Sequence, residues 1–270
     1  NGNPALKPTR ANQLDLTGEW YFSKNGSFTV ALFDKELSDV IVNQTNTVPV
    51  GDAAGKPVYF TVTSPVNGAK GYARGIELSV QRYFDMLPGW LSGFGVQANY
   101  TFVNSKTKLY NPVYSASCSG GSGDAENLNL NLNGCDTDGT TFGNLPLQNL
   151  SKHAYNLALL YDQGAVSARL AYSWRSKYLQ AVNVNGTNGG DGRDAAGNTV
   201  AWGLPTWNDA YGQVDGGITY SVTDALKFSL EGQNLTGKVN RQLMQQHIGF
   251  MTRAVFYTGP RYTLQASYTF

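Results

Sequence analysis

Hydrophobic and polar residues alternate with a period of two along most of the chain. In "AVSARLAYSWRSKY" (165–178), Val166, Leu170 and Trp174 fall on one face of an extended strand, and Ser167 and Arg169 fall on the other. This period predicts β-strands that have one apolar and one polar face. The same alternation recurs at 14–22, 94–102, 226–233 and 261–270.

The pattern predicts about nine strands, many of them ten or more residues long. Strands in soluble sandwiches usually have about five or six residues, whereas a tilted strand needs about 9–11 to cross a bilayer. Tyr155 and Tyr161 stand at the two ends of one apolar face, as aromatic girdle residues would. The predicted strands are 12–23, 27–43, 58–85, 91–106, 149–162, 165–180, 208–222, 226–236 and 252–270.

The predicted connections alternate between short and long. The short ones are 23–26, 85–89, 162–164 and 223–225, and the long ones are roughly 45–57, 106–149, 180–208 and 237–251. Bacterial outer-membrane barrels have short periplasmic turns and long extracellular loops. We therefore expect an all-β fold, a transmembrane antiparallel up-and-down β-barrel in the outer membrane of a Gram-negative bacterium, with outer-membrane lipids around it.

The final strand carries aromatic or apolar residues at alternate positions and ends on Phe270. Tyr262, Leu264, Tyr268 and Phe270 resemble the terminal signal that outer-membrane barrels present to the barrel insertion machinery. Phe270 should then lie on the periplasmic side, and nine strands place the start of the first strand outside the cell. Because single-chain barrels normally have an even number of strands, we expect further strands upstream.

Composition narrows the function classes. The net charge is +1, no basic stripe is visible, and only 14% of residues are charged, against about 25% in soluble domains. Nucleic acid is therefore not an expected partner. Apolar runs such as 157–161 are far too short for a membrane-spanning helix.

Two cysteines flank a loop rich in Gly, Asn and Ser. We predict a disulfide between Cys118 and Cys135, which implies an oxidising compartment; two unpaired thiols are the alternative. No metal site is expected, because the cysteines lack CxxC spacing and have no His nearby. Asp136 and Asp138 lack the closing Glu of a calcium loop, so a turn is favoured there.

Four segments resemble TonB-dependent outer-membrane receptors. They are "NPALKPTRANQLDLTGEWYF" (3–22), "GYARGIELSVQRYF" (71–84), "EGQNLTGK" (231–238) and "VFYTGPRYTLQASYTF" (255–270), although Thr9 stands where the family often has Glu. The sequence of residues 245–262 resembles the corresponding segment of Caulobacter- and Xanthomonas-type receptors. The resemblance implies that residues 1–270 are the C-terminal portion of a 22-strand barrel, and that the plug domain and the N-terminal strands are absent.

The resemblance also implies a function. The chain would belong to an energy-coupled importer driven by the TonB–ExbB–ExbD system through the missing plug, with no cofactor. An oligosaccharide is the first expected ligand and an iron-siderophore the second; a surface lipoprotein is a possible partner. A passive porin or a surface adhesin shares the alternation. An enzyme is not expected, because neither His153 nor His247 lies in a nucleophile motif.

Transport requires a polar lumen and ligand-binding loops rather than covalent chemistry. Charged side chains on the polar faces would line the lumen, or would simply contact the plug or one another. Long loops carry function in such scaffolds, and Trp rings beside amides suit sugars, although the tryptophans could equally anchor the barrel in the membrane. The lumen-facing candidates are Asp15, Glu19, Glu77, Arg169, Arg175, Asp215 and Glu231; the ligand-binding candidates are Trp202, Trp207, Asn208, Asp209, Tyr211, His247 and Arg253.

Overall fold

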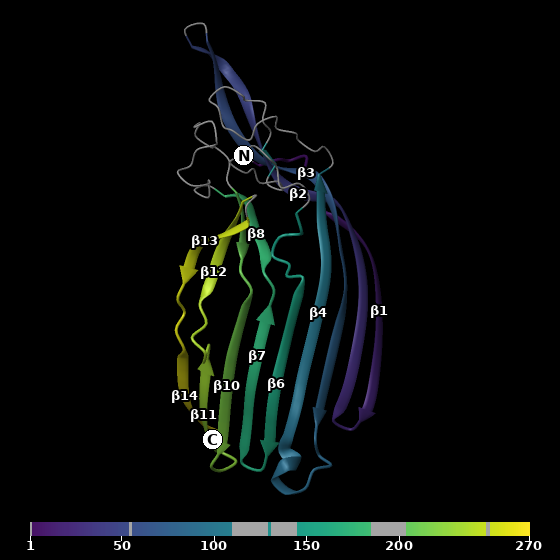
Figure 1. Cartoon of the computed structure of the whole chain (residues 1–270), viewed down its shortest axis with the longest axis vertical. Coiled ribbons are helices and arrows are strands. Elements are labelled where there is room, and N and C mark those ends of the chain that lie inside the picture. The colour runs from purple at the N-terminus through teal and green to yellow at the C-terminus, as the bar shows by residue number, and fades with distance from the viewer. Residues whose placement is uncertain (1, 54–55, 110–128, 131–144, 185–203, 247–248) are drawn as a thin grey trace.

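The computed structural model describes residues 2–53, 56–109, 129–130, 145–184, 204–246 and 249–270. This part of the chain forms a curved layer of antiparallel β-strands with one short 3-10 helix, η1 (Gly89–Gly93) (Figure 1). The strands are β1 (Arg10–Ser23), β2 (Gly26–Ala53), β3 (Lys56–Tyr83), β4 (Phe94–Leu109), β5 (Asn129–Leu130), β6 (His153–Gln163), β7 (Val166–Arg175), β8 (Tyr178–Val184), β9 (Leu204–Asn208), β10 (Tyr211–Ser221), β11 (Leu226–Gln233), β12 (Asn240–Gln246), β13 (Gly249–Phe256) and β14 (Arg261–Tyr268).

Nine strands form the main sheet in chain order. Their order is β1-β2-β3-β4-β6-β7-β10-β11-β14, and each neighbouring pair is antiparallel; the two-residue β5 adds to β2. This is the up-and-down order predicted from the sequence. The sheet is open, because β1 and β14 lie at its two edges and do not pair with each other. The marked termini lie toward opposite ends of the strands (Figure 1). This is expected when a chain runs along the length of a sheet an odd number of times.

The last four crossing strands are each divided into two segments. A second sheet, ordered β13-β12-β9-β8, continues the strands β14, β11, β10 and β7 of the main sheet. The divisions fall at 176–177, 209–210, 234–239 and 257–260. The predicted single strands 165–180 and 252–270 are therefore each interrupted near one end.

Two of the predicted long loops are wrong. Residues 45–57 continue the β2–β3 hairpin, whose pairing runs as far as Ala53 and Lys56. Residues 237–251 contain most of the β12–β13 pair, which runs from Asn240↔Phe256 to Gln246↔Gly249. Pro49, Gly51 and Gly249 look like loop residues in the sequence, but a register shift between Pro49 and Gly51 absorbs the first two within the ladder.

The main sheet has little apolar core of its own. Large apolar side chains remain exposed along it: Leu14 is 73% exposed, Leu16 65% and Leu264 78%. The only cluster of buried apolar residues recorded in the described segments, Leu145, Leu179 and Trp207, lies at the second sheet. A single layer with a bare apolar face must bury that face against something other than itself.

One close backbone approach explains a glycine in β3. The ring of Phe33 lies over Gly75, and a Cβ built at Gly75 would be 2.6 Å from Phe33 Cζ and would overlap the carbonyl oxygen of Phe102. A glycine within a strand often marks such an approach. The ring covers the gap that the missing side chain leaves.

Candidate ligand-contacting face

The register places all seven predicted lumen-facing residues on one face of the main sheet. Directly paired residues point to the same side of a sheet. Glu77 is paired with Ala31, which is paired with Thr17, and these pairs place Glu77 on the same face as Asp15 and Glu19. The same reasoning across the later strands adds the remaining residues: Arg169, Arg175, Asp215 and Glu231.

The opposite face is apolar and has aromatic residues near both ends. Trp20 is paired with Phe28 near the turn that joins β1 to β2, and this turn lies at the lower end of the view in Figure 1. Toward the upper end, Tyr155 stacks on Trp174 with ring centroids 5.1 Å apart. Two aromatic girdles that bound an apolar band are typical of transmembrane barrels.

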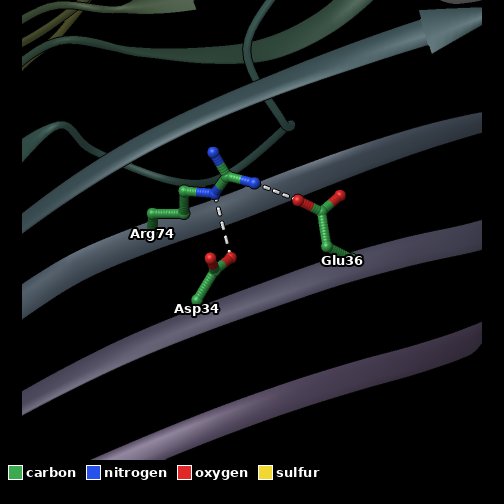
Figure 2. Close-up of polar contacts among 3 residues, drawn as sticks. All are labelled: Asp34, Glu36 and Arg74. Atoms are coloured by element: carbon green, nitrogen blue, oxygen red, sulfur yellow. Dashed lines mark hydrogen bonds and ion pairs between the residues drawn. The ribbon is translucent and has the colours of Figure 1, made fainter.

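A charged cluster marks the upper edge of this apolar band. Arg74 lies two residues before the apolar Ile76, on the same face of β3, and its Nε donates to Asp34 Oδ1 at 2.9 Å. Its second guanidinium nitrogen bonds Glu36 (Figure 2). The hydrogen bonds to Asp34 and then to Glu36 raise the pKa of Arg74, because they favour its charged form. Three ionic side chains in one place indicate that this level lies outside the hydrocarbon region.

The polar face continues into the second sheet as a cluster of amides, a phenol and two guanidinium groups. Tyr178, Asn208 and Gln242 are direct partners and therefore share a face. Asn208 Nδ2 donates to the Tyr178 hydroxyl, and the Arg175 guanidinium lies 4.6 Å from the Tyr178 ring centroid. Gln242 Nε2 donates to Gln180 Oε1, and Arg253 donates to Gln242 Oε1 at 3.1 Å. We call Arg175, Tyr178, Gln180, Asn208, Gln242 and Arg253 the upper polar cluster.

A second line of polar contacts runs along β10 below this cluster. The Tyr211 hydroxyl donates to Gln213 Oε1 at 2.8 Å, and Gln213 Nε2 donates to Asp215 Oδ1 at 2.6 Å. The same Asp215 oxygen accepts the backbone N–H of Asn234 at 2.8 Å. These residues form a continuous hydrogen-bonded path on the polar face that leads to the division between β11 and β12.

The structure separates Trp207 from its neighbour Asn208. Trp207 is paired with Leu179 and Leu243, so the indole lies on the face opposite the upper polar cluster. It is only 9% exposed, its Nε1 donates to Gln245 Oε1 at 2.9 Å, and its ring meets Phe250 edge-on at 5.6 Å. A largely buried indole on this face offers little surface to a ligand.

The other predicted ligand-binding residues are distributed differently. Asn208, Tyr211 and Arg253 belong to the two polar groups just described. Asp209 caps its own turn, because its Oδ1 accepts the N–H of Ala210 at 2.7 Å. Trp202 and His247, as well as Cys118 and Cys135 with their predicted disulfide, lie outside the described residues.

Sequence reasoning missed Tyr178, Gln180, Gln213 and Gln242 as members of the polar groups. Gln213 alternates with Asp215 and could have been found from the period of two. Gln242 could not, because the sequence predicts a loop over 237–251. The Nδ1 atom of His153 lies 2.8 Å from the Tyr100 hydroxyl. Within the described residues, no group of three or more His, Cys, Asp or Glu side chains could hold a metal ion.

The strand order, the two faces and the girdles agree with a comparison to known families. Residues 1–235 match the family described as TonB dependent receptor-like, beta-barrel. The chain belongs to this family. In the segments described here, no helix has the length and hydropathy needed to cross a membrane. No curated protein matches the chain.

Solved TonB-dependent receptors share the fold of this barrel segment. The siderophore receptor PirA from Acinetobacter baumannii is 14% identical, with a TM-score of 0.59 over 98% of this chain and 32% of that one. The outer membrane transporter YddB from Escherichia coli is 14% identical, with a TM-score of 0.57 over 98% and 33%. The copper transporter OprC is 16% identical, with a TM-score of 0.53 over 99% and 33%. The chain thus spans about a third of the length of these receptors.

Proposed function

We propose that this chain is the C-terminal part of the barrel of a TonB-dependent importer in the outer membrane. The family match carries this proposal, and the exposed apolar band between two aromatic girdles supports it. The remaining strands and a plug domain would complete the barrel, and the TonB–ExbB–ExbD system would act through that plug. The polar face would then line the lumen.

We propose an oligosaccharide as the ligand. The upper polar cluster offers amides from Gln180, Asn208 and Gln242 and a phenol from Tyr178. Amides both donate and accept hydrogen bonds, which suits hydroxyl groups that do the same.

Binding to the purified full-length receptor tests this ligand class. The probes are gluco-, xylo- and manno-oligosaccharides, measured by calorimetry. Removing two amides in the double variant Asn208→Ala, Gln242→Ala should weaken binding by about 10- to 100-fold, since each hydrogen bond is worth about 1 kcal/mol. Gln265→Ala on the polar face of β14 is the matched control and should leave affinity unchanged. If none of the sugars binds, the ligand class is wrong.

A ferric chelate is the second candidate, and the two guanidinium groups favour it. Arg175 and Arg253 would attract an anionic chelate. Under this alternative, Arg175→Gln and Arg253→Gln would weaken binding of a ferric catecholate probe, and added salt would do the same. Binding of a neutral sugar would be insensitive to salt.

A further inference from the structure

The turn between β3 and β4 differs from the other short turns of the sheet. Three of its large apolar side chains are exposed: Met86 is 58% exposed, Leu87 39% and Trp90 65%. The turns at 24–25, 164–165 and 222–225 carry small or polar residues, Val222 apart. An exposed apolar group of this kind marks an interaction surface.

The turn has a defined shape. The N–H of Phe84 donates to the carbonyl of Phe94 at 2.8 Å, and the N–H of Leu87 donates to the carbonyl of Phe84 at 2.9 Å. Gly89 has a φ of 59° and its carbonyl accepts a 3.2 Å bond from Gln163 Nε2 at the end of β6. The side chain of Gln163 on the neighbouring strand therefore fixes the backbone of the turn beside Trp90.

Trp90 extends the aromatic girdle of the apolar face. Its ring meets Phe94 at 5.8 Å in an edge-on arrangement, and Phe94 meets Tyr161 at 5.0 Å in the same way. Phe94 and Tyr161 are direct partners on the apolar face. The three rings form one continuous aromatic surface from that face into the turn, at the lower end of β4 (Figure 1).

We propose that the turn at 84–93 is a membrane anchor that lies in the headgroup region of the periplasmic leaflet. Tryptophan prefers this level, because its ring is apolar and its N–H can reach polar groups. Continuity with the lipid-facing girdle identifies the occupant as phospholipid rather than a periplasmic protein. Met86 and Leu87 add apolar area beside the indole. This inference rests on the proposed function, in which the apolar face contacts lipid, and on the expectation that Phe270, at the lower end of the sheet, lies on the periplasmic side.

Depth-dependent fluorescence quenching in lipid vesicles tests the anchor. The full-length receptor is reconstituted in phosphatidylcholine vesicles, with or without lipid dibrominated near the headgroup end of the acyl chain. The difference between the wild type and Trp90→Phe gives the emission of Trp90 alone. We expect the brominated lipid to remove most of this emission, and aqueous iodide to remove little of it.

Trp20 provides a matched control, because it lies on the apolar face and is 66% exposed. Its emission, obtained from Trp20→Phe, should also be lost in brominated lipid. If Trp20 is quenched by lipid but Trp90 is quenched by iodide, the turn faces water and the anchor is refuted, while the contact of the apolar face with lipid stands. If iodide reaches both residues, the apolar face does not contact lipid and the proposed function itself is wrong.

Discussion

At the scale of single residues, Asn234 joins the divisions of two neighbouring strands. Its Nδ2 donates to the carbonyls of Lys238, at 3.0 Å, and of Thr258, and its Oδ1 accepts the N–H of Lys238 at 2.8 Å. The residue is 5% exposed and has a φ of 50°. Asparagine tolerates this backbone conformation better than most residues, and its side chain satisfies groups that the interrupted ladder leaves free.

Asn234→Ala should therefore destabilise the receptor. The change leaves the carbonyl of Thr258 and the N–H of Lys238 without their partner, and each such loss costs about 1–3 kcal/mol. The measurement is the temperature at which the folded barrel loses its anomalous mobility on an SDS gel. Asn234→Gly is the control: it removes the same bonds but relieves the backbone, so it should fall between the wild type and alanine. Equal stability of all three proteins would contradict this role.

The period of two predicted the face of each charged residue but not its contacts. The shared face of Asp15, Glu77 and Glu231 follows from their positions in alternating strands alone. The neighbours of Arg175 or Gln242 depend on the pairing register and on where a strand is divided. The alternation of apolar and polar residues predicts neither the register nor the division. The two roles of Trp207 stayed open for this reason: it falls in the predicted loop 180–208, and its pairing with Leu179 and Leu243 cannot be derived from the local pattern.

At the scale of elements, the β2–β3 pair depends on a close approach at Gly75. The Phe33 ring covers this glycine, and the carbonyl of Phe102 on β4 lies directly beside it. Gly217, which is also on the polar face, has only ordinary contacts: a Cβ there would be 3.6 Å from Glu231 Cγ. The two glycines differ in what a methyl group would meet.

Gly75→Ala is expected to destabilise the sheet, whereas Gly217→Ala is expected to be tolerated. At Gly75 the backbone of β4 and the Phe33 ring must both shift, at a cost of about 1–3 kcal/mol. The measurement is the fraction of heat-modifiable, folded receptor in outer-membrane extracts. Comparable loss in both variants would show that the approach at Gly75 is not special.

Element positions were more predictable than element lengths. All four short turns lie where the sequence placed them, but the turn predicted at 85–89 extends over 84–93 and contains η1. The β2–β3 and β12–β13 pairs extend into segments that carry Pro, Gly and Asn. Cross-strand pairing outweighs local propensity there, because each residue added to a ladder gains a partner on the neighbouring strand.

At the scale of the whole molecule, the odd number of successive strands in the main sheet, β5 apart, places the two marked termini at opposite ends of it. The turns at 24–25, 164–165 and 222–225 lie at the lower end of the sheet with the C-terminus, and the upper ends of β2 and β4 lie toward the other end (Figure 1). Lys106 is near the end of β4. In the proposed orientation, the lower end faces the periplasm.

Cysteine labelling of intact cells should report this orientation. Lys106→Cys should react with a membrane-impermeant maleimide added to cells, while Lys24→Cys and Asp224→Cys should react only after the outer membrane is permeabilised. The parent receptor gives the background from Cys118 and Cys135. The reverse pattern of labelling would invert the topology and with it the assignment of the upper polar cluster to the outer side.

The length of the β2–β3 hairpin has a consequence for the cell surface. From Asp34, at the edge of the apolar band, β2 continues to Ala53, and at about 3.3 Å per residue this is roughly 60 Å of strand. That is longer than the apolar band is tall, about 25 Å in such barrels. In the proposed orientation the hairpin projects away from the cell, so antibodies and bacteriophages would meet it before they reach the barrel wall. Its sequence is thus expected to vary among strains faster than the strands below it.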